Sequence, residues 1–436
     1  MYDEQVFRVS CFVARVLKLF VIALFLFGVW NSLWAKPLRI EITGSKLSGV
    51  PFAVTNFTES HDLDISDIVR QDLQNSGQFQ LKSRENVDDH EYWRAIGADI
   101  LVQGNILQTD MDDFDVSFQL IDLYKKTNPV ILSYVFSKQQ KKKFRALAHH
   151  ISDLVFEKTT GVKGFFSTHI AYITVEHTKN HTIHTLTVSD TDGENDIALL
   201  SAQYPLMSPS WSPDGKKIVF VSFKDNRASI KTIDIASGAI DNVTNFPGIN
   251  GAPKWSPDGS KLALVLSKDG APKIYTLDLA TKKLDRLTHG GAIDTEPFWH
   301  PSGKSLVFTS NRSGRPQIYQ VGLEDQNVTK ITYEGDYNST PSITPDGRNL
   351  LMLHRNENGN FNIAVQDLTS GRLRKLTNAQ ADESPTLAPN GMMVLYGARE
   401  SQNNILSAVT LDGKFNMRLP VQDANVKEPA WSPFSH

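Results

Sequence analysis

A repeat of constant length constrains this chain more than any other feature of its sequence. A segment of the form Pro-x-Trp-Ser-Pro-Asp-Gly, first seen at Pro209–Gly215, recurs through the C-terminal half. Its leading proline returns every 44 residues, at Pro209, Pro253, Pro297, Pro341, Pro385 and Pro429. A fixed period of this length is the signature of a repeat architecture in which each repeat is one supersecondary unit.

Each period has the pattern of short β-strands. An apolar stretch such as Lys217–Ser222 follows the Pro-Asp-Gly turn, and a second one such as Ser229–Ile235 follows a polar turn. A further turn leads to a short edge strand that ends at Val243–Thr244. Asp-Gly and Asn-Gly between apolar stretches are strong hairpin signals because these residues tolerate positive φ. Four strands in roughly 40–50 residues predict one blade of a β-propeller.

The two ends of the array complement each other. The first unit, Ile170–Ser201, has three strands and lacks the Trp-Ser-Pro-Asp-Gly segment ahead of them. The last eight residues, Pro429–His436, match this missing innermost strand. We therefore predict that residues 165–436 form an all-β six-bladed propeller closed by the C-terminal strand, which leaves no open sheet edge.

Residues 36–160 lack the 44-residue period and mix two kinds of pattern. Asp64–Asn75 and Lys141–Lys158 have apolar residues at helical spacing, and His90–Gly97 fits a shorter helix. Strand patterns occupy Leu38–Thr43, Val50–Asn56, Ile100–Leu107, Asp115–Leu123 and Val130–Phe136. The sequence thus predicts a mixed α/β N-terminal domain that Gly161–Gly164 joins to the propeller.

The first 35 residues are typical of a secretory signal peptide. Arg8, Arg15 and Lys18 give a positive start, Leu19–Trp30 is almost wholly apolar, and Ala35 offers a small residue for cleavage. This run is shorter than the about 20 apolar residues of a spanning helix. The only cysteine, Cys11, precedes it, so the exported chain would hold no disulfide or zinc thiolate. We predict a signal peptide over residues 1–35 and export to the periplasm of a Gram-negative bacterium.

Three groups of residues with potential chemistry are better explained as turns. His177, His181 and His184 flank a hairpin rather than share a helix face, and no carboxylate completes a metal spacing. Asp190–Asp196 begins like a calcium loop, but Ser201 stands where the loop needs its glutamate. The repeated serines lack a nucleophile elbow, and their period argues for turn chemistry. We expect no catalytic residue, no metal site and no cofactor, and the net charge of −3 gives no reason to expect nucleic acid.

Two columns of residues suggest a binding site. The loop that enters each innermost strand should lie at the mouth of the central channel, just before the leading proline. Steps of 44 give a first column of Asn250, Asp294, Asn338 and Asp382. Two places further on lies a second column of Ala252, Glu296, Thr340, Ser384 and Glu428. A polar, acidic rim around a concave mouth would suit a docking site, although propeller mouths are commonly polar and wet in any case.

These motifs resemble the TolB family, the periplasmic propeller proteins of the Tol–Pal envelope system. The resemblance covers the whole chain after the predicted signal peptide and is most specific in Asn250–Ala263, Thr295–Trp299, Gly314–Tyr319, Ser384–Gly391 and Pro429–Pro433. Members of this family are not enzymes. The resemblance implies a monomeric protein-binding scaffold, peripheral to the membranes, that supports outer-membrane integrity and constriction during cell division.

The resemblance also implies two partners. The propeller mouth would bind Pal, an outer-membrane lipoprotein, through loops that include Asn250, Gly251, Ala252, Thr295 and Glu296. An N-terminal arm over Lys36–Thr43, which begins Lys36, Pro37, Leu38, Arg39, Ile40, would bind TolA of the inner membrane. Gly248–Ile249 departs from the family, which often has a more polar pair with histidine there.

Other function classes remain open on the sequence alone. A prolyl-oligopeptidase-like hydrolase uses similar repeats but needs a following hydrolase domain, and this chain ends at His436 within a blade strand. A propeller lactonase would need inward carboxylate and amide ligands for calcium, some of which the mouth columns supply. A carbohydrate or peptidoglycan binder would need more aromatic residues than the mouth loops hold.

Overall fold

The computed structural model describes residues 49–57, 65–378, 381–400, 403–419 and 425–434. The predicted signal peptide and the arm over Lys36–Thr43, with its predicted strand, lie outside these ranges. Within the described ranges, no helix combines the length and the apolar character needed to cross a membrane.

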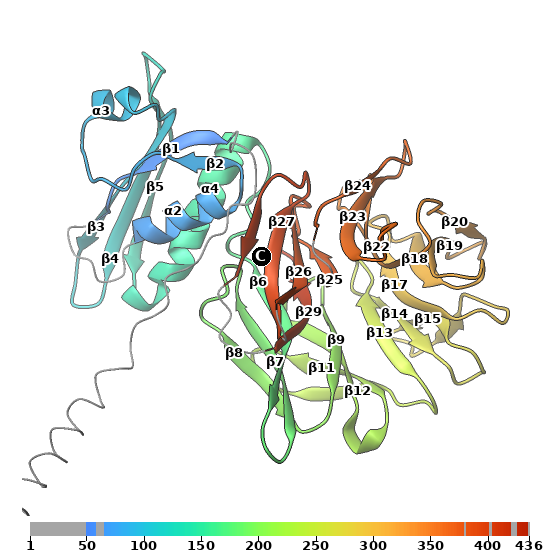
Figure 1. The fold of residues 1–436 in the computed structure, drawn as a ribbon. Helices are drawn as coiled ribbons and strands as arrows, with labels where there is room; N and C mark the ends of the chain where they lie inside the picture. The colour runs from blue at the N-terminus through green and yellow to red at the C-terminus, as the bar shows by residue number, and fades with distance from the viewer. Residues whose placement is uncertain (1–48, 58–64, 379–380, 401–402, 420–424, 435–436) are drawn as a thin grey trace, which may run out of the picture. The chain divides into compact units, whose positions relative to one another are not determined.

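A five-stranded sheet forms the centre of the N-terminal α/β domain, in the order β2-β1-β3-β4-β5 (Figure 1). β1 pairs in parallel with β2 and β3, and β3, β4 and β5 are antiparallel. The strand bounds are β1 Val50–Val54, β2 Phe79–Leu81, β3 Ile100–Gln108, β4 Phe114–Asp122 and β5 Val130–Gln139. Sequence patterns missed β2, because three residues are too few to show a strand period.

Helices cover both faces of this sheet. α2 (Ile65–Asn75) and α4 (Phe144–Thr160) pack on one face through apolar stripes that include Val69, Leu73, Ile151 and Val155. On the other face α3 (His90–Ala95) buries Trp93 against Ala53, Leu101 and Ile121. α4 begins three residues later than predicted, after the 3-10 turn η1 (Lys141–Lys143). It ends where Gly161 takes the left-handed conformation that favours glycine at a helix C-terminus.

The described strands that follow form six four-stranded antiparallel sheets, which are the six blades of the propeller (Figure 1). Five blades are continuous in the chain. They comprise β9 Leu206–Trp211, β10 Lys217–Ser222, β11 Ser229–Asp234 and β12 Ile240–Thr244, with the 3-10 turn η2 Lys224–Asn226; β13 Asn250–Trp255, β14 Lys261–Leu266, β15 Lys273–Asp278 and β16 Leu284–Arg286; β17 Asp294–Trp299, β18 Ser305–Ser310, β19 Gln317–Gly322 and β20 Val328–Lys330; β21 Asn338–Ile343, β22 Asn349–Arg355, β23 Phe361–Asp367 and β24 Leu373–Lys375; and β25 Asp382–Leu387, β26 Met393–Glu400, β27 Asn403–Thr410 and β28 Asn416–Arg418.

The remaining blade joins the two ends of the propeller, as the sequence predicts. Its order is β29-β6-β7-β8, with bounds β29 Asn425–Trp431, β6 His169–His177, β7 Thr182–Asp190 and β8 Ile197–Ala202. Figure 1 shows the red C-terminal strand among the green strands of this first blade. Trp431 pairs with Ile170 and Val426 with Thr174. The closing strand starts four residues before Pro429 and ends at Trp431, so it lies slightly earlier than predicted.

The repeated Trp-Ser-Pro-Asp-Gly segments form turns, which confirms the structural interpretation of their serines. In the first, the Ser212 hydroxyl donates to Asp214 and accepts a bond from the Lys217 amide at 2.9 Å. The same pair of bonds recurs at Ser256 and at Thr344. The tryptophans link blades: the Trp211 indole donates to the Ala430 carbonyl and the Trp299 indole to the Lys254 carbonyl, each at 3.0 Å.

Candidate functional site

The six innermost strands enclose two cavities along the central channel. A cavity of about 290 Å³ lies near the starts of these strands and is lined by the second column, from Ala252 to Glu428, together with Ser208. A cavity of about 370 Å³ lies near their ends and is lined by tryptophans such as Trp255. Lys254, Phe298 and Thr386 line both cavities, so the two meet at these side chains. We call the opening at the strand starts the mouth.

The second column shares a rare backbone conformation. Its five residues, and Ser208 one 44-residue step earlier, have φ between 45° and 53°: Ser208, Ala252, Glu296, Thr340, Ser384 and Glu428. Each lies where the register of the innermost strand shifts, which marks a β-bulge. Residues other than glycine rarely adopt positive φ, and such positions concentrate at functional sites. The six bulges therefore indicate the mouth as a candidate functional site.

The two acidic members of this column hold neighbouring blades together. Glu296 accepts bonds from the Thr340 amide at 2.9 Å and from the Thr309 hydroxyl at 2.7 Å. Glu428 accepts a bond from the Ser208 amide across the closure of the ring. Burial raises the pKa of Glu428, against the lowering effect of these hydrogen bonds. The expected acidic rim is therefore partly structural, because one carboxylate oxygen of each residue is used inside the protein.

The first column lies beneath the mouth surface rather than on an exposed loop. Its members are the first residues of β13, β17, β21 and β25, and each is at most 2% exposed: Asn250, Asp294, Asn338 and Asp382. Asn250 donates to the Phe246 carbonyl at 2.7 Å, and Asn338 to the Glu334 carbonyl at 2.9 Å. Each amide thus fixes the loop four residues before it. Sequence periodicity assigned this column to the loops that enter the strands, but its residues begin the strands and are covered, because burial depends on how the preceding loop folds over the strand.

Blade four replaces this amide with a buried ion cluster. The Lys273 ammonium lies 3.1 Å from Asp294 Oδ2 and also donates to the Ala292 carbonyl. Arg312 lies 2.9 Å from Asp294 Oδ1, with its guanidinium over the rings of Tyr319 and Phe308. Asp294 therefore anchors the loop that ends at Ile293.

Apolar residues at the mouth were missed by the search for polar columns. Ile249 and Ile293 directly precede β13 and β17 and are 47% and 48% exposed. Their amides are held by the Ser267 hydroxyl at 2.7 Å and by Asn311 Oδ1 at 2.8 Å. The same 44-residue step, taken one place before the first column, would have found both. Grouped exposed apolar side chains mark protein-binding surfaces, which makes this pair on neighbouring blades a candidate partner contact.

Asp382, the first-column residue of blade six, allows the effect of a buried carboxyl at this position to be tested. Burial raises the pKa of Asp382 to about 6, against the lowering effect of the Thr377 hydroxyl, and no hydrogen bond to Asp382 Oδ1 is found among the described residues. The protonated carboxyl of Asp382 stabilises the folded state relative to the ionised form. Since the folded pKa exceeds the usual value of 3.8, this contribution to stability is complete below about pH 4 and is lost as the pH rises through 6. We expect Asp382→Asn to stabilise the protein at pH 7.5 by at most about 3 kcal/mol and to have little effect at pH 4.5, as measured by urea unfolding.

The reciprocal exchange is the matched control. Asn338→Asp places a carboxylate at the equivalent position of blade five, where Gln317 Oε1 accepts from the Asn338 amide at 2.9 Å. It should destabilise the protein at pH 7.5 and less so at pH 4.5. An Asp382→Asn protein with unchanged pH dependence of unfolding would contradict the assignment.

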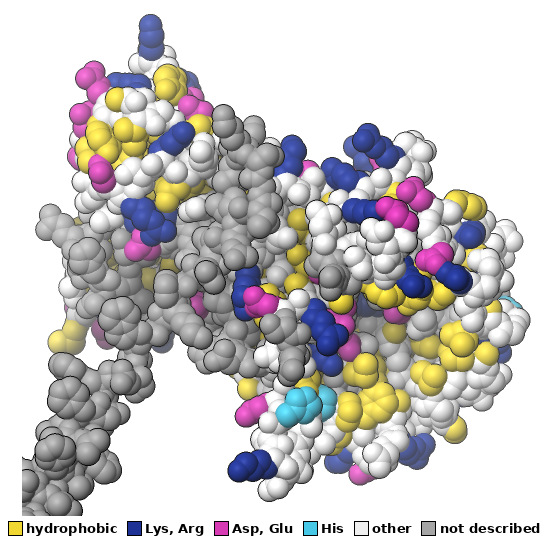
Figure 2. Space-filling view, in the orientation of Figure 1, with side chains coloured by type: hydrophobic (Ala, Val, Ile, Leu, Met, Phe, Trp, Pro, Cys, Tyr) yellow, Lys and Arg dark blue, Asp and Glu magenta, His cyan; other side chains and the backbone are white. Residues whose placement is uncertain are grey.

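The clusters that the sequence analysis assigned to turns are turns. In the β6–β7 hairpin the Thr178 amide donates to the His181 carbonyl, and His177 bonds the Thr182 hydroxyl. The start of Asp190–Asp196 closes through the Asp190 amide and the Glu194 carbonyl at 3.0 Å. Its aspartates also contact α4, which no local pattern indicated. Acidic and basic side chains are interspersed on the visible face of the molecule, in keeping with the net charge of −3 (Figure 2).

Comparison with known proteins gives matches over nearly the whole chain. The family model described as the TolB amino-terminal domain matches residues 38–128, and that of the TolB beta propeller domain matches residues 156–435. The chain is 54% identical over 413 residues to the Tol-Pal system protein TolB of Coxiella burnetii, with 91% of this chain and 94% of the relative covered. It is 50% identical to that of Pseudomonas putida, with 92% and 95% covered.

A solved structure supports the same arrangement of domains. The crystal structure of TolB from Acinetobacter baumannii matches with a TM-score of 0.83 and 36% identity. The match covers 91% of this chain and all of the solved one. Together with the strand order given above, it confirms the α/β domain followed by a six-bladed propeller.

Proposed function

The chain belongs to the TolB family of the Tol–Pal system, and on that premise we propose that it is a periplasmic scaffold with two partners. The propeller mouth binds Pal, the N-terminal arm binds TolA, and the complex supports outer-membrane integrity and constriction during division. The family is a family of scaffolds and not of enzymes, so the hydrolase and lactonase alternatives are set aside.

The fixed apolar rim of the mouth is the observation that carries this proposal. Ile249 and Ile293 are half-exposed, yet their amides are hydrogen-bonded to Ser267 and Asn311. Buried Asn250 and Asp294 anchor the same loops from below. A surface held in this way loses little conformational entropy when a partner docks, which favours tight association.

The predicted contact residues divide into two roles on this basis. Six of them are partly exposed at the mouth and are proposed to touch Pal: Gly251, Ala252, Thr295, Glu296, Thr340 and Ser384. The buried first column of Asn250, Asp294, Asn338 and Asp382 is proposed to act indirectly, by fixing the loops. The arm residues Lys36, Pro37, Leu38, Arg39 and Ile40 lie outside the described residues, so their proposed role rests on the family alone.

A pair of variants separates the two binding activities. Thr295→Arg places a long cation in the half-buried mouth position beside Ile293 and is expected to weaken Pal binding at least about tenfold. Deletion of residues 36–43 is expected to abolish TolA binding. Dissociation constants for purified Pal and TolA, measured by calorimetry with both variants, test the proposal, and each variant serves as the control for the other.

A matched substitution controls for the added charge. Thr329→Arg introduces the same side chain on the exposed outer strand β20 of the same blade and should leave both affinities unchanged. Equal affinity of Thr295→Arg and the unaltered protein for Pal would move the binding site away from the mouth. Retained TolA binding after the deletion would remove the arm from the proposal.

A further inference from the structure

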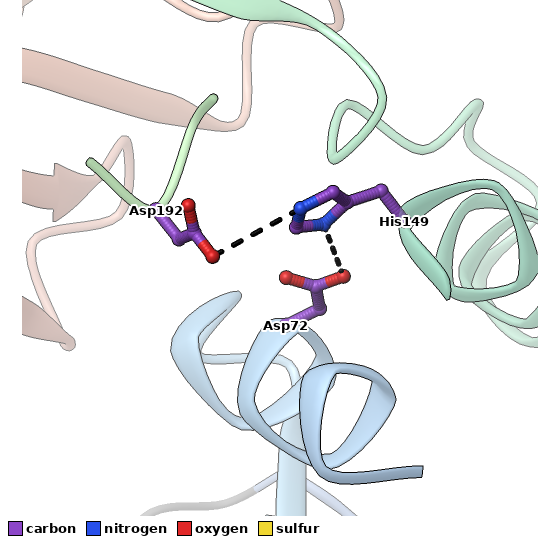
Figure 3. A group of neighbouring side chains, drawn as sticks. All are labelled: Asp72, His149 and Asp192. Carbon is purple, nitrogen blue, oxygen red and sulfur yellow. Dashed lines mark hydrogen bonds and ion pairs between the residues drawn. The ribbon is translucent and has the colours of Figure 1, made fainter. Parts of the chain in front are cut away.

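A buried charged cluster joins the α/β domain to blade one, away from the mouth. α4 places Arg145 and His149 one turn apart against the β7–β8 turn, which carries Asp190 and Asp192. His149 is only 2% exposed, and its Nδ1 lies 2.8 Å from Asp72 Oδ2 on α2 (Figure 3). Three separate elements of the chain therefore meet at one imidazole.

The other ring nitrogen of His149 is without a hydrogen bond. Nε2 is buried and has no hydrogen-bond partner among the described residues, although it points toward Asp192 of the propeller (Figure 3). It lies 3.8 Å from Asp190 Oδ2 and 3.9 Å from Asp192 Oδ2. These separations are too long for hydrogen bonds, and more than about 90% of buried polar groups have a partner. An imidazole nitrogen facing two carboxylate oxygens needs an explanation.

A metal ion fits this gap. Bonds of about 2.0–2.2 Å from a tetrahedral zinc ion to nitrogen and oxygen place the two ligand atoms about 3.4 Å apart. The separations of Nε2 from these two oxygens need to contract by only about half an ångström. A mixed imidazole and carboxylate set favours zinc, cobalt or nickel, whereas magnesium and calcium prefer oxygen ligands alone.

The surrounding contacts match those that support metal ligands. Metal-bound histidines commonly donate their second ring N–H to a carboxylate, and Asp72 is placed to accept that bond. Metal-bound carboxylates are in turn hydrogen-bonded, and Arg145 donates to Asp190 Oδ2 at 2.7 Å and to Asp192 Oδ2. Each carboxylate oxygen has two lone pairs, so an oxygen that accepts from Arg145 can still bind a metal.

The charge balance also favours a divalent ion. Asp72, Asp190 and Asp192 carry three negative charges when ionised, and Arg145 with a protonated His149 carries two positive ones. Replacement of the Nε2 proton by a divalent ion makes the cluster neutral, while that proton competes with the metal.

We propose that His149 Nε2, Asp190 Oδ2 and Asp192 Oδ2 bind a divalent transition-metal ion of the zinc class, with water in the fourth position. Asp72 and Arg145 are positioning residues for these ligands. The ion would clamp α4 onto the β7–β8 turn of blade one and so fix the α/β domain to the propeller.

Cobalt and zinc titrations of the purified, chelator-treated protein test this site. We expect one tight Co²⁺ per chain with a visible absorption band of low-symmetry coordination, displaced by Zn²⁺ and not by Ca²⁺. His149→Gln should weaken binding at least about 100-fold, and Asp72→Asn about 10–100-fold. Affinity should rise with pH from 6 to 8, because binding releases the Nε2 proton, and a pH indicator dye should record about one proton per ion.

Two further variants keep the result decisive. The surface histidines are removed together in His177→Gln/His181→Gln/His184→Gln, which should retain the tight site. Asp192→Asn removes a ligand from the turn and replaces His149→Gln if that protein does not fold. The proposal is overturned if the unaltered protein shows no tight Co²⁺ site, if the site survives the loss of His149 or Asp192, or if the hairpin variant loses it.

Discussion

Removal of β29 is expected to prevent the propeller from closing and to lower its unfolding temperature by more than about 10 °C. The strand buries Val426, Ala430 and Trp431, and loss of one large buried side chain alone costs about 3–5 kcal/mol. Its C-terminal end is also bonded to the start of β6: Ser432 exchanges bonds with His169, and the Trp431 indole donates to the Thr168 hydroxyl at 2.8 Å. In domains of this size, each kcal/mol corresponds to about 2–4 °C. Calorimetry of the protein truncated before Asn425 measures the effect.

Two control experiments show whether the loss of β29 causes the lower stability. Truncation after Phe434 leaves β29 intact and should unfold within a degree or two of the full chain. A synthetic peptide of residues 425–436, added to the truncated protein, should restore part of the lost stability by filling the same place. A truncated protein as stable as the full chain would defeat the closure model.

Asp294→Ala is expected to destabilise the protein by about 3–5 kcal/mol and to weaken the mouth. The change leaves the ammonium of Lys273, which is 1% exposed, with a carbonyl as its described partner and no counter-charge in contact. Removal of one member of a buried ion pair has this large effect because the remaining charge stays out of water. Urea unfolding gives the stability, and Pal affinity gives the effect on the loop that carries Ile293.

The repeat itself supplies the matched control for this prediction. Lys273 of blade three and Asp294 of blade four correspond, 44 residues on, to Gln317 of blade four and Asn338 of blade five. There the Asn338 amide donates to Gln317 Oε1 at 2.9 Å without any ion. The double variant Lys273→Gln/Asp294→Asn should therefore stay within about 1 kcal/mol of the unaltered protein. If Asp294→Ala were as stable as the double variant, the Lys273 charge would have another compensating partner, and the prediction would be wrong.

Only part of the candidate site could be predicted from the sequence. The 44-residue period located both columns, and it would have located Ile249 and Ile293 had apolar residues been searched in the same way. It did not reveal that Asn250 and Asp382 are covered, because exposure depends on the loop packed over them. Nor did it reveal that Glu296 bonds the Thr340 amide of the next blade, since a bulge aims that side chain sideways.

The sequence by itself determined the propeller, its number of blades and its closing strand. Each of these is encoded in local turn and strand patterns, and the chain repeats those patterns often enough for chance to be excluded. Only the tertiary structure decided what the repeat does not encode. The contact of His149 with Asp72 spans 77 residues, and that of Arg145 with Asp192 spans 47. The first contact arises from packing two helices of the α/β domain, and the second from packing that domain on the propeller; no periodic signal predicts either of them.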